Sequence, residues 1–367
     1  MVYQLTTDQK EKIRQYVPLF HEYQASPQSK ADLNERKERL ALYQPLTKEQ
    51  ILQLDEADIL GLITKLWATQ FWKNQQYILE KLISDNGFEK LKKELAELLC
   101  GDGEVTKRYE IFMKLIKHLG PASITEMLSS KDPDKCAIWN DKARKALTIL
   151  CFEGVLPLRK YKITGKELAK FNDVCWGIAN ELAETGMDKP DLFGVDYFLY
   201  EVTLSSPVSV RTPKTINKEK DFDHDEIGEH LRDIGIWLGF HADVRQKVGH
   251  GAEVDVLWRA QIGNLGVVTY IFEVQKKGSI DSLILNLQKA KANPTVQKVV
   301  AVSDIGQLEK IRKETIGLQA EFRDALAFMQ ISEVEQVHEN LSQAMSTIER
   351  LELVKDLFPI EGKKNGG

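Results

Sequence analysis

VVTYIFEVQKKGSIDSLILNLQKA, residues 267–290, carries the strongest strand and helix signals of the region around it. Residues 267–275 are β-branched and aromatic in most positions, which is typical of a strand. From Ser279 onward the apolar residues recur at helical spacing, and serine is a residue that caps helices. The stretch therefore predicts a strand that leads directly into a helix.

Further elements are expected on both sides of this stretch. Residues 221–240 carry apolar residues on one helical face, and residues 241–248 and 252–258 predict two strands. The short apolar run 296–304 predicts a buried strand. In chain order, residues 221–304 should form helix, strand, strand, strand, helix and strand.

Two carboxylates fall on neighbouring strands of this order. Alternation along the second strand puts Val254 and Val256 on one face and Asp255 on the other, and Glu273 lies near the end of the third strand. A short turn between the strands can place Asp255 and Glu273 side by side. Because adjacent carboxylates repel each other unless a cation lies between them, the pair predicts a Mg²⁺ or Mn²⁺ site. Such a cation can activate water and neutralise charge on a phosphate.

The side chains that follow the glutamate alternate in direction. A period of two puts Glu273, Gln275 and Lys277 on one face, and Val274 and Lys276 on the other. A lysine or glutamine two residues past the glutamate would stand beside the attacking water.

The element order and these residues resemble the PD-(D/E)xK nuclease superfamily, whose core is αβββαβ. The likeness covers about residues 221–304, and the segment looks particularly like restriction-endonuclease-type domains of prokaryotic defence proteins. In this resemblance Asp255 matches the motif aspartate, Glu273 the (D/E), and Gln275 the final position usually held by lysine. It implies that Asp255, Glu273 and the Val274 carbonyl hold the metal ion.

The resemblance implies further site residues. The helix-borne acid of the family falls on Glu226 or Glu229, and Gln288 matches a polar residue of the second core helix. Glutamine at the lysine position departs from the family, and a displaced lysine can supply the charge. Strand alternation favours Lys277 over Lys276 for that role. Lys276 and Gln288 are also candidates for DNA contact.

Two histidines, His224 and His250, flank the expected site. Neither has a ligand partner at a recognisable spacing in the sequence. The expected metal set therefore contains no histidine.

The sequence before residue 206 is expected to be mainly helical. Residues 50–72 and 77–99 carry apolar residues at helical spacing, with a break in the second segment near residues 86–87.

A Leu-Gly-Pro-Ala turn between two short helical segments, within residues 115–147, resembles a helix-hairpin-helix. The glycine turn and the helix start of such a hairpin can receive a phosphate, which makes Gly120, Ala122 and Ser123 candidate DNA contacts. A plain helical hairpin packed on the core is the alternative.

The chain as a whole is expected to be an α+β protein. The predicted parts are a helical recognition or regulatory domain, a polar linker, the nuclease-like core, C-terminal helices and a disordered tail, at residues 1–206, 207–220, 221–304, 305–360 and 361–367. An apolar stripe near the C-terminus predicts either a core-packing helix or a dimerisation helix, and comprises Val337, Leu341, Ala344, Ile348, Leu351 and Val354.

Composition is that of a soluble globular protein of 367 residues, with 43% hydrophobic and 29% charged residues. No apolar run approaches the roughly 20 residues that span a bilayer, and no secretory signal is recognisable. The widely spaced cysteines Cys100, Cys136, Cys151 and Cys175 predict reduced thiols and a cytoplasmic location.

A net charge of −5 and a pI of 5.9 do not favour a nucleic-acid partner. Local basic segments are sufficient to contact phosphates, and residues 142–145, 158–166 and 211–220 are candidates.

The function expected from these residues is that of a Mg²⁺-dependent endodeoxyribonuclease in restriction or anti-phage defence, with DNA and other defence proteins as partners. The alternative is a catalytically inactive nuclease fold that binds DNA or serves in assembly. A helical protein–protein adaptor would leave the acid-bearing strands unexplained.

Overall fold

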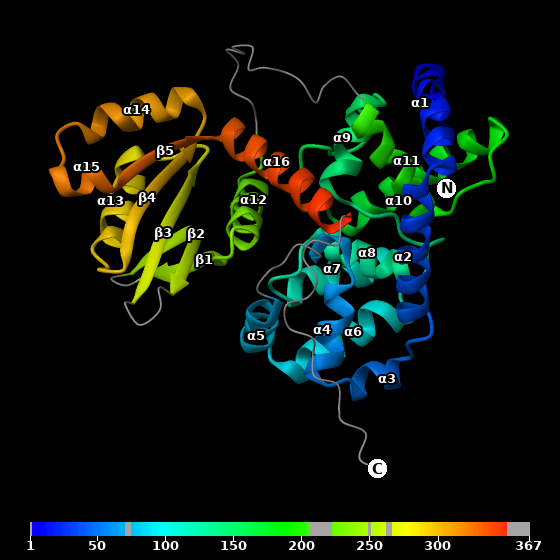
Figure 1. Cartoon of the computed structure of the whole chain (residues 1–367), viewed down its shortest axis with the longest axis horizontal. Helices are drawn as coiled ribbons and strands as arrows, with labels where there is room; N and C mark the ends of the chain where they lie inside the picture. Colours follow the sequence, from blue (N-terminus) through cyan, green and yellow to red (C-terminus); the bar gives the residue numbers. More distant parts are fainter. Residues whose placement is uncertain (1, 70–74, 206–221, 249–250, 262–265, 351–367) are drawn as a thin grey trace. The chain divides into compact units, whose positions relative to one another are not determined.

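The computed structural model describes residues 2–69, 75–205, 222–248, 251–261 and 266–350. These residues form sixteen α-helices, one 3-10 helix and a five-stranded sheet, with the helices first along the chain (Figure 1). The predicted α+β class is therefore confirmed. None of the described helices combines the length and apolarity that crossing a membrane requires.

The chain divides into two compact units, Met1–Lys218 and Glu219–Gly367. The predicted linker at residues 207–220 and the predicted tail at 361–367 lie outside the described residues.

The described part of the first unit is built from helices. They are α1 (Thr7–Ala25), α2 (Pro27–Tyr43), α3 (Lys48–Gln53), α4 (Glu56–Thr64), η1 (Trp67–Thr69), α5 (Gln75–Asn86), α6 (Phe88–Cys100), α7 (Val105–Leu115), α8 (Pro121–Lys131), α9 (Asp141–Ile149), α10 (Gly165–Glu184) and α11 (Leu192–Ser205). The predicted break near residues 86–87 is confirmed, because Gly87 separates α5 from α6 with a φ of +81° that favours glycine.

The second unit contains the sheet. Its elements are α12 (His224–Trp237), β1 (His241–Val248), β2 (Ala252–Gln261), β3 (Val267–Gln275), α13 (Ile280–Lys291), β4 (Val296–Ser303), α14 (Ile305–Thr315), α15 (Ala320–Ala325), β5 (Leu326–Gln330) and α16 (Ile331–Arg350). The element order predicted for the expected core is confirmed. So is the cap at Ser279, whose hydroxyl accepts a hydrogen bond from Ser282 N at 3.3 Å.

The strands lie in the order β1-β2-β3-β4-β5 (Figure 1). β1, β2 and β3 pair antiparallel, whereas β4 is parallel to both β3 and β5. α13 provides the crossover that the parallel pair β3–β4 needs. The register of β2 with β3 sets Val256 opposite Phe272.

β5 corrects the prediction that residues 305–360 are helical only. This strand is the short apolar segment LAFMQ, half-buried along its length, and pairs with β4. An apolar run of this length has no decisive periodicity, so the sequence alone does not distinguish a strand from part of a helix.

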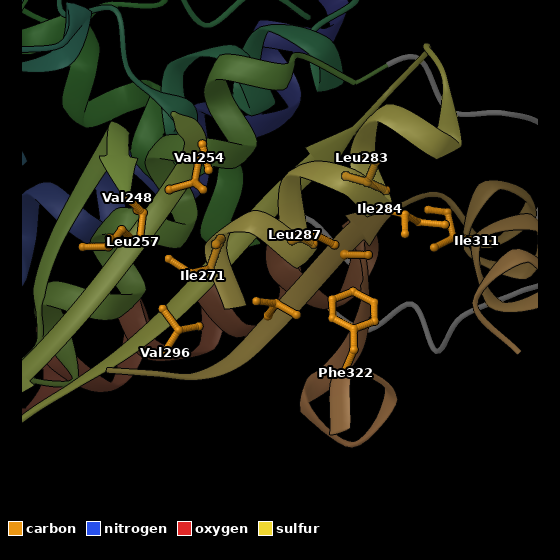
Figure 2. Close-up of a cluster of buried hydrophobic side chains, with 14 of the residues drawn as sticks. Val248, Val254, Leu257, Ile271, Leu283, Ile284, Leu287, Val296, Ile311 and Phe322 are labelled. Carbon is orange, nitrogen blue, oxygen red and sulfur yellow. The ribbon is translucent and has the colours of Figure 1, made fainter. Parts of the chain in front are cut away.

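Helices cover both faces of the sheet (Figure 1). On one face, Leu283 and Leu287 of α13 pack with Leu257 and Ile271 of the sheet (Figure 2). On the other face a second cluster joins α12 and α16 to β2, β3 and β4, and contains Ile227, Leu231, Ile234, Val256, Phe272, Val274, Val300 and Val334.

The start of the C-terminal apolar stripe belongs to this second cluster. Val337 and Leu341 of α16 pack against it, as the core-packing interpretation predicts. Leu351 and Val354 lie outside the described residues. A dimer formed through α16 stays a prediction.

The prediction that Val254 and Val256 share a face is wrong. Val254 belongs to the cluster beneath α13, and Val256 to the cluster beneath α12 and α16. Between the pairs Val244↔Val256 and Gln246↔Val254, Arg245 has a φ of +51°. The pleat is irregular at this position, and the period of two does not hold across the neighbouring part of β2.

We expect Leu287→Ala to lower the free energy of unfolding by about 2–5 kcal/mol, because Leu287 is 0% exposed and its truncation leaves a cavity under the sheet. The matched control is Leu285→Ala on the same helix. Leu285 is 52% exposed, and its loss should change stability by no more than about 0.5 kcal/mol. Urea unfolding followed by circular dichroism measures both, and equal effects would contradict the packing described.

Candidate functional site

Asp255 and Glu273 are neighbours on adjacent strands. Val256 pairs with Phe272 in the antiparallel register of β2 and β3; Asp255 comes just before Val256 and Glu273 just after Phe272, so the predicted adjacency is confirmed. Their carboxyl groups hydrogen-bond to each other, and Glu273 is only 7% exposed. Two acidic groups are therefore held together, Glu273 almost fully buried and Asp255 half-buried.

The backbone of β3 contributes to the same place. Val274 N–H donates a hydrogen bond of 2.8 Å to Asp255 Oδ2. In a regular antiparallel strand a residue directs its N–H and its C=O toward the same neighbour. The Val274 carbonyl is therefore expected on the side of Asp255 as well.

Glu273 is fixed from the α13 face of the sheet. Asn286 Nδ2 donates to Glu273 Oε1 at 2.6 Å and to the Glu253 carbonyl at 2.6 Å. Burial raises the pKa of Glu273, and the charge of Asp255 and the hydrogen bond to it raise it further, to about 9. At neutral pH the acid pair therefore shares one proton.

His224 approaches the pair from the start of α12. Its Nε2 lies 3.3 Å from Asp255 Oδ2, and its Nδ1 lies 3.8 Å from Asp225 Oδ1. Hydrogen bonds to Asp225 and then to Asp255 raise the pKa of His224 to about 10. Burial alone would raise the pKa of Asp255, but His224 and the Val274 N–H lower it overall.

A further charged residue extends this chain of contacts. Arg245 forms an ion pair with Asp225, and Arg245 is the left-handed residue of β1 that lies across from Asp255. Asp223 caps α12 by accepting hydrogen bonds from Asp225 N at 2.9 Å and from Glu226 N at 3.2 Å. The helix start is thus fixed in the position that brings His224 to the acid pair.

The residues after Glu273 take separate positions. Gln275 is half-buried at the end of β3, where its carbonyl accepts a hydrogen bond from Ser303 of β4. Lys276 donates to the Phe222 carbonyl and lies 5.4 Å from the Phe222 ring centroid. Lys277 is exposed.

The helix-borne acids implied by the resemblance lie elsewhere on α12. Glu226 Oε1 is 3.8 Å from His230 Nε2, and Glu229 Oε2 is 2.8 Å from Arg232 Nη1. Glu226 and Glu229 come two and five residues after His224, so they leave α12 about 200° and 140° around the helix axis from it. A role of Glu226 or Glu229 at the acid pair stays a prediction.

On α13, Asn286 contacts Glu273, whereas the DNA contact expected of Gln288 stays a prediction. The sequence reasoning missed Asn286 and excluded His224. A signal for Asn286 existed, since it lies one helical turn from both Leu283 and Ala290 on the buried face of α13. A polar residue in that position requires a partner.

The candidate DNA contacts of the first unit are packed into it. Ser123 of α8 is 5% exposed, Ala122 is half-buried, and the Tyr161 hydroxyl occupies the space where a side chain at Gly120 would start. This packing agrees with a plain helical hairpin, the alternative that the sequence left open, and DNA contact at Gly120, Ala122 and Ser123 stays a prediction.

The basic segments are ion-paired within the described residues. Arg144 and Lys145 contact Asp141 at 3.4 Å and 2.8 Å, and Lys160 contacts Glu167 at 2.6 Å. Residues 211–220 lie outside the described part of the chain. The four cysteines are free thiols.

The oxygen atoms at the acid pair fit a divalent cation as ligands. Ionisation of both carboxyl groups would leave two negative charges in contact in a buried place, and a shared proton avoids this. Carboxylate and carbonyl oxygens are ligands that Mg²⁺ and Mn²⁺ accept. Asp255, Glu273 and the Val274 carbonyl are therefore the groups that would hold such an ion.

Comparison of the chain with protein-family models, with curated proteins and with solved structures finds no match.

Glu273→Gln should make stability less dependent on pH. The folded protein raises the pKa of Glu273 from an ordinary 4.5 to about 9, so its contribution to stability is present below about pH 4.5 and is lost as pH rises toward 9. Glutamine mimics the protonated acid, and the variant should gain on the wild type steadily between about pH 5 and pH 9 in EDTA. Urea midpoints measure this gain. The control, Glu253→Gln at an exposed position of β2, should show no such gain, and parallel curves for all three proteins would refute the shared proton.

Proposed function

We propose that this protein is a divalent-metal-dependent endodeoxyribonuclease that hydrolyses DNA phosphodiester bonds in restriction or anti-phage defence. The observation that carries the proposal is the Asp255–Glu273 pair. Its carboxyl groups contact each other on adjacent strands, and the burial of Glu273 together with the charge of Asp255 raises the pKa of the Glu273 carboxyl. Such an arrangement is unfavourable for folding unless a ligand uses it.

Mg²⁺ or Mn²⁺ bound at Asp255, Glu273 and the Val274 carbonyl would supply Lewis-acid stabilisation of the phosphate charge. The chain's own groups prepare the site for this. Val274 N–H and His224 hold Asp255, and Asn286 orients Glu273. The two carboxyl groups are thus positioned before substrate arrives, and such preorganisation is the main requirement for electrostatic catalysis.

The reaction is hydrolysis. A water oxygen forms a bond to phosphorus while the ester P–O bond breaks, one proton leaves the water, and the leaving oxygen takes up a proton as it becomes an alcohol. Gln275 is two residues past Glu273 on the same strand, and in this proposal its side-chain amide orients the attacking water. The order of helices and strands in the second unit supports the proposal through its resemblance to the αβββαβ core.

A second candidate function is a nuclease fold that binds DNA or serves in assembly without cleaving. Gln275 at the usual lysine position, and the engagement of Lys276 by the Phe222 carbonyl, favour this alternative. Neither observation concerns the acid pair, so a DNA-cleavage assay separates the two functions.

We expect the purified wild type to cleave plasmid or phage DNA with Mg²⁺ or Mn²⁺ and not with EDTA. Asp255→Ala and Glu273→Ala should each lower the rate by at least about 10²-fold, because each removes a group that holds the ion. Gln275→Lys should be tolerated or should raise turnover, since an ammonium group adds charge stabilisation.

The control is Glu253→Ala, which removes an exposed carboxylate from the same strand as Asp255. It should leave cleavage unchanged. Full activity of both Asp255→Ala and Glu273→Ala would end the nuclease proposal, whereas metal-independent DNA binding without cleavage would support the inactive fold.

A further inference from the structure

We propose that His224 contacts the phosphate that is cleaved and provides there the hydrogen-bond donor that the resembled family takes from a lysine at position 275. This inference rests on the proposed function. It assigns a catalytic role to a residue that the resemblance does not identify.

The first observation is the state of the lysine position and its neighbours. Gln275 has a neutral amide, Lys276 donates to the Phe222 carbonyl, and Lys277 is exposed at the strand end. The structure instead brings His224 into contact with Asp255, at 3.3 Å. A nitrogen donor is therefore present at the acid pair, but it comes from α12 rather than from β3.

The second observation is the direction of the imidazole. Nε2 faces the Asp255 oxygen that also accepts the Val274 N–H. A phosphate that binds at the acid pair must approach the same carboxylate, so the Nε2–H group is within reach of a phosphate oxygen. His224 is also the first residue of the fourteen-residue helix α12, whose N-terminal end favours an anion.

The third observation is the support behind the imidazole. Nδ1 faces Asp225 at 3.8 Å, and Asp225 is ion-paired with Arg245. Arg245 has a φ of +51°, a backbone conformation that is unfavourable for a non-glycine residue and that is concentrated at ligand-binding sites. Asp225 and Arg245 are thus positioning residues that keep Nε2 turned toward the acid pair.

The test is a double-mutant cycle between His224 and Gln275. His224→Ala should lower kcat by about 10²-fold, the usual loss when one donor to the transition state is removed. Gln275→Lys should raise the rate of the His224→Ala variant by at least about tenfold, a larger gain than the same substitution gives in the wild type. His224→Gln, which retains an N–H donor, should keep more activity than His224→Ala.

Rescue separates a contact with the phosphate from a structural role, because a lysine on β3 cannot repair a disturbed helix start. His241→Ala, at an exposed histidine of β1, is the control and should behave as the wild type. A double variant no more active than His224→Ala, or a fully active His224→Ala, would overturn the inference.

Binding gives a second readout that needs no turnover. In Ca²⁺, which supports binding without fast hydrolysis, the anisotropy of a labelled short DNA duplex should show weaker affinity for His224→Ala, and recovery on adding Gln275→Lys. Equal affinity of His224→Ala and the wild type would count against the contact. If the wild type and His224→Ala both cleave DNA fully while Asp255→Ala is inactive, only this inference fails. If the wild type does not cleave at all, the proposed function fails with it.

Discussion

Two carboxyl groups in contact below the surface are the constraint on which the second unit depends. Ionising both Asp255 and Glu273 there would cost several kcal/mol, because burial removes water and each charge repels the other. The surrounding groups each reduce that cost. Val274 N–H and His224 donate to Asp255, and Asn286 donates to Glu273. The site is therefore a satisfied network with one retained proton, rather than a pair of isolated charges.

The layered fold explains how donors reach the pair from different directions. α13 packs on one face of the sheet through Leu283 and Leu287, and this packing holds Asn286 beside Glu273. α12 packs on the other face, and its capped start brings His224 to Asp255. Because the two helices belong to separate apolar clusters, each donor is positioned by its own part of the core. A rigid scaffold of this kind is what a precise polar site requires.

Local patterns predicted the sheet strands β1–β4, α13 with its cap, and the adjacency of Asp255 and Glu273, because those features follow from residue type and periodicity. They did not predict His224 as a partner of Asp255, since the contact joins residues far apart in sequence through the packing of α12 on the sheet. They also failed where Arg245 takes a left-handed conformation, because alternation assumes a regular pleat. The helix-borne acids were placed by resemblance, and in the structure Glu226 lies near His230 and Glu229 near Arg232.

The acid pair also bears on why such a site would persist. A buried carboxyl pair is often less stable than well-packed apolar residues of similar volume, so selection for stability alone would remove it. The hydrogen bonds at Glu273 lower the free-energy cost of burying its carboxyl group without eliminating it. Its pKa is still raised from the ordinary 4.5 to about 9. A ligand that binds only the folded state would add stability by mass action, about 2.7 kcal/mol at a hundredfold excess over its Kd. A cation exchanged for the shared proton would act in this way, so occupation of the site would stabilise the fold as well as prepare it for a phosphate.

A second unfavourable feature lies beside the acid pair. Arg245, which is ion-paired with Asp225 next to His224, has a left-handed backbone conformation. Two such features at one place are more simply explained by one bound substrate than by separate structural needs.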